Sequence, residues 1–522
     1  MTHTVFTGAR FTTLAASRPR ADAVVVRGER IVAAGTVDEC REAAGTGHRE
    51  VDLGGGWAVP GLTDSHIHLA GYARGKRWID LRGARSLADA QRVLAAYVRD
   101  LPDRAWVFGG RYDANTWGLD RPLHRCDLDP YAAGHPVALQ NHDGHTTWAN
   151  TVALQALGVD ASTPQPPGGV VEMDADGPTG LLREGADDVV YAAMDAHDVP
   201  PPEVFADAFT DLLASGVTTI HDIDGRATAA AYDALRADGR LTVRVHQLFS
   251  HAGLAAAVEA GHATGDGDAW LRTGPVKLFS DGALGSHTAA LSSPYEDRAD
   301  DFGVATLAPE ELLDLALTAS AAGIAVAVHA IGDAANTTVL DAIAEVRRRG
   351  VGARLRHRIE HAQHVAYPDV ERFAALGVVA SMQPVHCTSD VALARRLLGK
   401  RHLASYAWAD LAAAGAHVAF GSDAPVETID PVEGIRAATT RTAAESGERA
   451  DGNVLTPPQA LRAYTTEPAY ASGEEHCKGR LAPGYLADLV VLDADLTDRD
   501  VAASGSARPS VTVVGGEVRW SR

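Results

Sequence analysis

The sequence predicts an α/β protein built around a (β/α)8 barrel of the TIM type, with a small β-sandwich made from both chain ends. Three observations support this fold class. Strand-like and helical segments alternate through the middle of the chain, eight strand-like segments can be counted there, and side chains of metal-binding types follow several of them. With 522 residues, the chain is long enough for a large barrel and a smaller module. We expect the barrel to cover residues 59–474.

The expected barrel strands are short apolar runs bounded by glycine or polar residues. The helical segments between them carry start and stop signals: Ser86 opens one, Thr456 opens another, and Gly323 closes a third. Eight strands are the number that a closed β/α barrel requires. Their expected ranges are 57–64, 216–223, 241–249, 274–281, 323–331, 354–362, 377–384 and 417–423.

The connection between the first two expected strands is much longer than an ordinary βα loop. It includes aromatic and glycine-rich stretches such as "GGRYDANTWGLDRP" and "LQNHDGHTTWAN". We therefore predict an insertion at about residues 75–210 that lies over the barrel mouth and serves as a lid.

Both ends of the chain alternate between apolar and polar residues in the manner of strands. The pattern is clear in "HTVFTGARFTTL" and "ADAVVVRGERIVAAG" near the start and in "GYLADLVVLDAD" and "SVTVVGGEVRW" near the end. Neither end could bury its apolar face alone. We therefore predict that residues 1–58 and 475–522 meet in one composite β-sandwich.

The composition argues against some classes of binding partner. A formal net charge of −21, from 68 acidic against 47 basic residues, argues against nucleic acid and anionic membranes as partners. The sequence has no secretory signal and no run of about 18 apolar residues, so we expect a cytoplasmic protein with a small-molecule substrate. The oligomeric state stays open, with a homodimer as one alternative. The cysteines are far apart and predict reduced thiols: Cys40, Cys126, Cys387 and Cys477.

Candidate metal ligands follow the expected strands in a fixed order. His66 and His68 are two residues apart, so on a strand both side chains leave the same face and can bind one ion together. Ligands on different strands converge because the carboxyl ends of barrel strands meet at one mouth. Considered alone, His329 and His361 could each have a structural role instead. Asp423 could instead cap a helix. The full set is His66, His68, Lys277, His329, His361 and Asp423.

With these motifs, the chain resembles the amidohydrolase superfamily, and it is most similar to the branch that includes N-substituted formamide deformylases. The resemblance covers nearly the whole length, through "PGLTDSHIHL", "DGHTTWAN", "GPTGLLREGA", "VKLFSDGALGS", "VHAIGDAAN", "RIEHAQ", "FGSDAPVETIDPVEGI" and "GRLAPGYLADLVVLD". The chain departs from the branch pattern at His287 and Ala334, where arginine is frequent, and at Tyr112, which replaces a tryptophan. These departures concern the substrate pocket and leave the metal ligands unchanged.

The resemblance implies two divalent metal ions in the barrel mouth. His66 and His68 would bind the more buried ion, and His329 and His361 would bind the second. Asp423 would be both a ligand and the catalytic base. Imidazole and carboxylate ligands suit zinc, with manganese or iron as alternatives.

Lys277 has a special place in this ligand set. An ordinary ammonium group cannot bind a cation, but a lysine carbamate formed with CO2 offers two anionic oxygens that can bridge two ions. The resemblance implies this modification at Lys277. In the alternative, Lys277 pairs with Asp281 or another acid, and the site holds one metal.

The ligand set and the resemblance predict a metal-dependent hydrolase that cleaves a C–N bond in an amide, formamide or cyclic imide. A bound ion would lower the pKa of water to about 7, and Asp423 would pass the water proton to the leaving nitrogen. His145 in "DGHTTW" is the expected catalytic contact to the developing oxyanion, with anchoring of the insertion as its alternative. Two other functions stay open: deamination or ring closure on the same fold, and a catalytically silent binding protein.

Further residues are candidates for substrate contacts. The two aromatic residues would form an apolar wall or, alternatively, the core of the insertion. The two acids have an alternative role in orienting ligands or capping helices. The candidates are Tyr112, Trp117, Glu184, Asp281 and His287.

Overall fold

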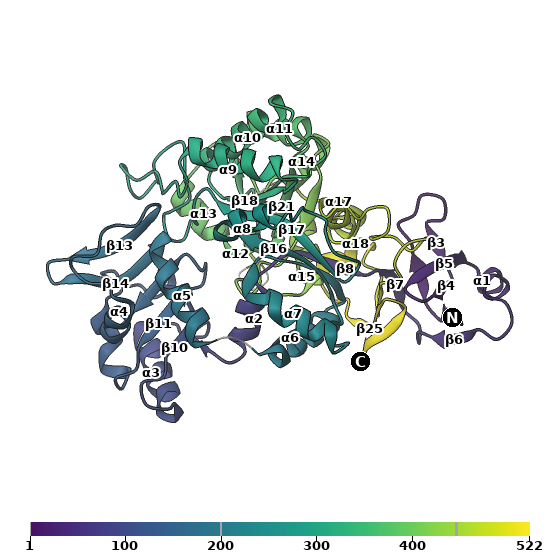
Figure 1. Cartoon of the computed structure of the whole chain (residues 1–522), viewed down its shortest axis with the longest axis horizontal. Helices are drawn as coiled ribbons and strands as arrows, with labels where there is room; N and C mark the ends of the chain where they lie inside the picture. The colour runs from purple at the N-terminus through teal and green to yellow at the C-terminus, as the bar shows by residue number, and fades with distance from the viewer. Residues whose placement is uncertain (1, 199–200, 444–446, 451) are drawn as a thin grey trace.

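Parallel strands form the central sheet of the computed structural model, which describes residues 2–198, 201–443, 447–450 and 452–522. Among these residues, eight strands follow the order β23-β21-β19-β18-β17-β16-β15-β8. The predicted barrel of parallel strands is confirmed (Figure 1). Its strands are β8 (Leu62–Ile67), β15 (Val217–Asp222), β16 (Arg244–Ser250), β17 (Leu271–Phe279), β18 (Val326–Ala330), β19 (Arg358–His361), β21 (Val379–Met382) and β23 (Val418–Phe420).

The first and last barrel strands meet at their carboxyl ends. The backbone N–H of Asp423, just after β23, donates to the carbonyl of His66 at 2.7 Å, and the N–H of His68 donates to the carbonyl of Ala424 at 2.8 Å. Gly421 permits this close approach, because a Cβ atom there would lie 2.4 Å from the backbone nitrogen of His66. The closure therefore brings Asp423 beside both histidines of the first strand.

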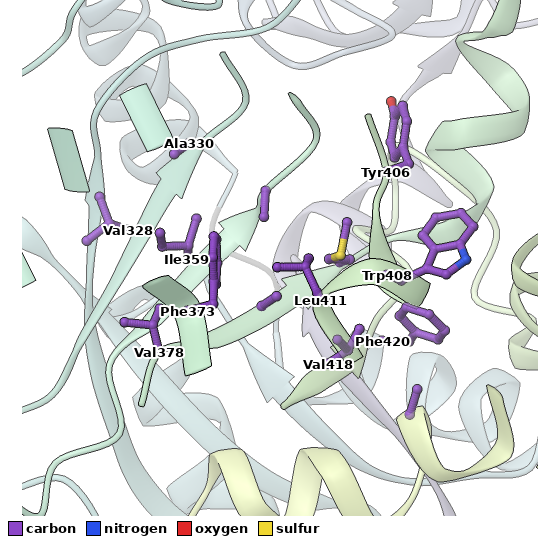
Figure 2. Close-up of a cluster of buried hydrophobic side chains, with 14 of the residues drawn as sticks. Val328, Ala330, Ile359, Phe373, Val378, Tyr406, Trp408, Leu411, Val418 and Phe420 are labelled. Atoms are coloured by element: carbon purple, nitrogen blue, oxygen red, sulfur yellow. The ribbon is translucent and has the colours of Figure 1, made fainter. Parts of the chain in front are cut away.

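Helices cover the outside of the barrel because the strands present apolar side chains there. Val328 on β18 and Ile359 on β19 belong to a large apolar cluster that also contains Phe373 and Trp408 (Figure 2). The residues that alternate with them, such as Glu360, face the barrel interior and bond there to polar groups. The covering helices include α6 (Pro202–Ala214), α7 (Arg226–Ala237), α9 (Pro309–Ala321), α10 (Asp333–Arg348), α11 (Tyr367–Leu376), α14 (Trp408–Ala413) and α15 (Pro431–Thr440).

Strands from both chain ends pair in one sheet. β7 (Trp57–Pro60) pairs with β24 (Leu489–Leu492), in the order β26-β25-β24-β7-β2-β3. A second sheet, in the order β5-β4-β1-β6, packs against it through shared apolar residues such as Phe6, Phe11 and Val513. The remaining strands are β1 (His3–Thr7), β2 (Arg10–Thr12), β3 (Arg20–Ala21), β4 (Ala23–Arg27), β5 (Arg30–Gly35), β6 (Arg49–Asp52), β25 (Pro509–Val514) and β26 (Glu517–Ser521).

The expectation of a single strand over 57–64 is wrong. The segment is divided between β7 in the end sheet and β8 in the barrel, with Gly61 between them. A Cβ atom at Gly61 would lie 2.2 Å from the hydroxyl of Thr218, so only glycine fits where the chain passes from one sheet into the other. The barrel strand therefore starts later than expected and carries His66 within it.

The chain between β8 and β15 builds a further sheet beside the barrel (Figure 1). Its apolar core includes Leu94, Leu139 and Trp148. The expected end of the insertion, near residue 210, falls inside α6, which packs against the barrel. The sheet order is β13 (Gly169–Asp174), β14 (Gly177–Glu184), β12 (Thr146–Ala149), β11 (Val137–Asn141), β10 (Val107–Tyr112) and β9 (Ile79–Asp80), with α3 (Leu87–Tyr97), α4 (Thr151–Leu157) and α5 (Asp188–His197) alongside.

In the described part of the chain, no helix combines the length and the apolar character that crossing a bilayer requires.

Candidate metal centre and active site

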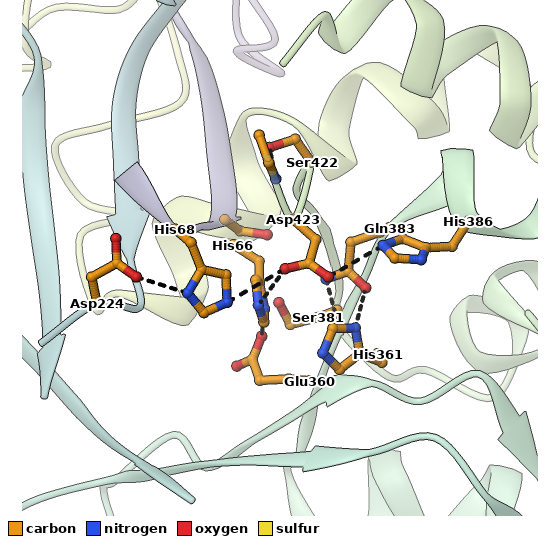
Figure 3. Close-up of polar contacts among 12 residues, drawn as sticks. His66, His68, Asp224, Glu360, His361, Ser381, Gln383, His386, Ser422 and Asp423 are labelled. Carbon is orange, nitrogen blue, oxygen red and sulfur yellow. Dashed lines mark hydrogen bonds and ion pairs between the residues drawn. The ribbon is translucent and has the colours of Figure 1, made fainter. Parts of the chain in front are cut away.

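Histidines and one aspartate gather at the barrel mouth. His66 on β8, His361 at the end of β19 and Asp423 after β23 each offer a ligand atom, and these atoms lie within 4.8 Å of one another. Nε2 of His66 is 3.3 Å from Oδ1 of Asp423, and Nε2 of His68 is 3.5 Å from the same oxygen (Figure 3). The structure thus brings three of the six predicted ligands, His66, His68 and His361, close to a fourth, the carboxylate of Asp423.

The three histidines are held in one tautomer by oxygen atoms behind them. A carboxylate or amide oxygen can only accept, so each Nδ1 carries a proton, and when the ring is neutral its Nε2 keeps the lone pair. The fully buried Nε2 of His66 has no hydrogen-bond partner among the described residues. A lone pair held in this way suits a metal ion. The pairs are His66 with Oε2 of Glu360 (2.7 Å), His68 with Oδ1 of Asp224 (2.8 Å) and His361 with Oε1 of Gln383 (2.8 Å).

Charge at the mouth also fits a cation. Burial raises the pKa of Asp423, but His66, His386 and His361 outweigh this effect and hold that pKa well below its usual range. Burial, together with the nearby His329, keeps the pKa of His361 well below that of a free histidine. The group therefore combines an anionic carboxylate with a neutral imidazole, which are both ligand types that zinc accepts.

His329 on β18 stands beside this group with the opposite tautomer. Its Nε2 donates to the carbonyl of Gly282 at 3.1 Å and lies 3.5 Å from Oδ1 of Asp281. Its ring centre is 4.5 Å from that of His361. The lone pair of His329 is therefore on Nδ1, so this histidine would bind a metal through a different nitrogen.

Lys277 on β17 is buried in the same region, with 3% of its surface exposed. Burial lowers its pKa to about 8, and Nζ lies 4.5 Å from the ring centre of Phe279. Among the described residues, Lys277 forms no ion pair. The expected alternative partner, Asp281, instead accepts backbone N–H groups of Ile331, Gly332 and Ala290. The lowered pKa increases the share of neutral amine, the form that can react with CO2.

A cavity of about 300 Å³ lies between the metal-binding group and the insertion. His145 lines it, with a ring centre 5.1 Å from that of His329. Nδ1 of His145 donates to Oε2 of Glu184 at 2.9 Å. Burial lowers the pKa of His145, but the charge of Glu184 outweighs burial and raises this pKa to about 9. The imidazolium that results can donate a proton or a hydrogen bond toward the cavity.

Other predicted substrate contacts do not line this cavity. Tyr112 and Trp117 pack in the core of the insertion, where Nε1 of Trp117 donates to a backbone carbonyl at 3.0 Å. This placement favours their alternative role as core residues. His287 pairs with Asp297 at 3.1 Å, and its ring contacts the tilted ring of Tyr295 at 4.9 Å between ring centres. It also lies outside the cavity lining.

The sequence patterns missed several residues of the site. Nε2 of His386 lies 3.3 Å from Oδ2 of Asp423, opposite His66. Burial lowers the pKa of His386, but Asp423 outweighs burial and raises this pKa to about 9. A signal existed, because His386 lies two residues after the expected barrel strand 377–384. Glu360 and Gln383, which orient His66 and His361, also lie beside recognised strand ends.

Known proteins resemble the chain over most of its length. The sequence model of the amidohydrolase family matches residues 49–519. A putative amidohydrolase, YtcJ, from Bacillus subtilis is 32% identical, covering 96% of both chains. The N-substituted formamide deformylase of Arthrobacter pascens is 30% identical, covering 96% of this chain and 95% of that protein. An uncharacterised metal-dependent hydrolase from Pyrococcus horikoshii has a TM-score of 0.78 at 27% identity and covers 95% of this chain and 98% of its own. The chain therefore belongs to the amidohydrolase family.

Proposed function

We propose that the protein is a metal-dependent hydrolase that cleaves a C–N bond of a small amide, formamide or cyclic imide. One observation carries this proposal: imidazole nitrogens with fixed lone pairs surround the anionic carboxylate of Asp423. That donor set fits a divalent cation, because neutral imidazole and ionised carboxylate are its usual ligands. The nearby cavity provides space for a small substrate.

We assign the metal ligands as two groups. His66 and His68 would hold one ion, His329 and His361 would hold the other, and Asp423 and a carbamate on Lys277 would complete the set. We favour zinc, with manganese or iron as alternatives. When bound, these ions supply Lewis acidity, which polarises a carbonyl group and makes water a stronger acid.

The chain's own residues would then move the proton. As a water oxygen attacks the carbonyl carbon, a carboxylate oxygen of Asp423 accepts a water proton. When the C–N bond breaks, that proton goes to the nitrogen, so an amide or formamide gives a carboxylic acid and an amine, and a cyclic imide gives an open-chain acid that keeps an amide. His145, held by Glu184, would donate a hydrogen bond to the oxygen on which negative charge develops. His386 would help to keep Asp423 in place.

Metal content and turnover test this proposal together. Purified protein that never met a chelator should hold about two equivalents of divalent metal, and Lys277→Ala should lose one or both. Hydrolysis should be found in a panel of N-substituted formamides, acyl amino acids, cyclic imides and carbamates, and chelation should abolish it. The name of the Arthrobacter relative supports testing formamides first. Less than about one-tenth of an equivalent of metal, with no turnover after metal is added, would refute the proposal.

A further inference from the structure

Gln363 is a buried polar residue that the mechanism above does not use. It lies between β19 and β20 (His364–Val365), lines the cavity and is 2% exposed. Among the residues that the structure describes, its side-chain carboxamide forms no hydrogen bond. Folded proteins pair nearly all buried polar groups, because an unpaired buried amide is costly. The carboxamide faces the cavity without a partner in the described part of the chain, so it is free to bond to a ligand there.

The backbone around Gln363 is held in a strained turn. His361 and Ala362 have φ angles of 72° and 42°, a region that residues other than glycine rarely adopt. The turn is fixed on both sides, because the N–H of Tyr406 donates to the carbonyl of Gln363 and the N–H of His364 donates to the carbonyl of Ile331. Its effect is that His361 and Gln363 both line the cavity. Strain of this kind collects at sites where a side chain must be aimed.

The other amide side chains of the cavity are already engaged. Oδ1 of Asn115 accepts from Arg396, and Oδ1 of Asn141 accepts from the backbone N–H of His142. The remaining wall combines charged residues such as Asp143, Asp390 and Arg396 with apolar ones. The apolar lining residues are Ala283, Leu284, Ile331, Ala392, Leu393 and Val426.

We propose that Gln363 recognises the N–H of a secondary amide substrate. Its Oε1 accepts this N–H, while the apolar wall holds the substituent on the nitrogen. The inference rests on the proposed function and narrows it to neutral secondary amides with an apolar N-substituent. An ester of the same shape has no N–H, so Gln363 also sets the preference for a C–N over a C–O bond. A buried group built to accept a hydrogen bond discriminates against an analogue that lacks the donor.

A matched pair of substrates tests this role in the metal-loaded enzyme. N-hexylformamide and hexyl formate differ at the scissile atom, N–H against O. In Gln363→Leu, kcat/KM for the amide should fall about tenfold, and the value for the ester should change less than about threefold. Gln363→Met, which keeps the length of the side chain, should behave in the same way. Gln155→Leu, at an exposed glutamine on α4, is the matched control and should leave both values unchanged.

Thermal stability separates substrate recognition from a structural role. Because the carboxamide has no partner in the free protein, Gln363→Leu should leave the Tm unchanged or raise it. A lowered Tm, or an equal loss on amide and ester, would overturn the inference. If the wild type hydrolyses amides but both Gln363 variants keep its amide-to-ester ratio, this inference fails and the proposed function stands. If the wild type hydrolyses cyclic imides but no amide, only this inference fails; if it hydrolyses neither, both fail.

Discussion

At the residue scale, the candidate centre depends on side chains that lie behind the ligands. Glu360 is fully buried, and burial raises its pKa. Arg358 and His66 lower that pKa by more than burial raises it, so Glu360 stays ionised. Arg358 in turn reaches the carbonyl of Ser65 at 2.7 Å and Oγ of Ser381 at 2.8 Å. One buried ion pair therefore connects β8, β19 and β21 directly below the mouth and fixes the ring of His66.

Glu360→Gln tests this orientation. An amide can present its NH2 group to Nδ1 of His66 and allow the other tautomer, so the lone pair would leave the metal side. We expect metal affinity to fall about 10- to 100-fold, measured by competition with a chromogenic chelator. Glu345→Gln, at a half-buried position on α10 where the carboxylate pairs with Arg348 and Arg349, provides the control. Equal affinities in the two variants would remove Glu360 from the metal site.

Asp423→Asn tests proton transfer. The variant keeps the size and backbone position of the side chain but cannot accept a proton as a carboxylate does. We expect a folded protein, by circular dichroism, with kcat reduced at least about 100-fold on a formamide substrate. Turnover near that of the wild type would refute Asp423 as the base.

At the element scale, the sequence predicted where strands occur better than it predicted which strands pair with one another. Short apolar runs bounded by glycine or polar residues identified the barrel strands. Ser86 caps α3 as expected, because its side chain accepts from the N–H of Asp89. The division at Gly61 was missed because β7 is held by β24, more than four hundred residues away, and no local pattern records such pairing. His386 was missed although it follows an expected strand closely, because it lies on a short helix, α12 (Pro384–Ser389), where the alternation of side chains along a strand no longer indicates direction.

A histidine at the start of β19 makes the barrel sensitive to acid. Nδ1 of His357 accepts from the N–H of Val326 at 3.2 Å, and burial lowers the pKa of His357 to about 3. Below the unfolded value of about 6.5, the unfolded chain binds a proton that the folded chain does not, so stability is lost as pH falls from about 6.5 toward 3.

His357→Asn should reduce this loss, because asparagine keeps an acceptor but does not titrate. Urea unfolding at pH 7 and pH 5 would measure it. The stability difference between the two pH values should shrink by up to about 1.4 kcal/mol for each pH unit. An identical difference in both proteins would show that protonation of His357 does not contribute.

At the scale of the whole molecule, two bodies share one cavity. The barrel carries every proposed metal ligand, whereas the insertion contributes residues such as Asn141, Asp143 and His145 to the cavity wall. Arg396 on α13 (Val391–Leu398) donates to Asn115 at 3.3 Å and connects the two. The length of the connection after the first strand predicted an insertion there. The sequence did not predict which residues of the insertion line the cavity, because this depends on how the insertion sheet lies against the barrel.

Replacing residues 105–185 with a short flexible linker separates the two roles. Metal uptake should persist, because no proposed ligand lies in that segment, while turnover should be lost with the cavity wall. Metal analysis and formamide hydrolysis on the same preparation would decide. Equal loss of metal and turnover would mean that the segment supports the barrel rather than the substrate.

The meeting of both chain ends in one sheet has a practical consequence. The N-terminus lies near the end of the molecule opposite the insertion, and the C-terminus lies between that end and the barrel (Figure 1). A resin or sensor chip coupled through the N-terminus would therefore leave the cavity, which lies toward the insertion, facing open solution.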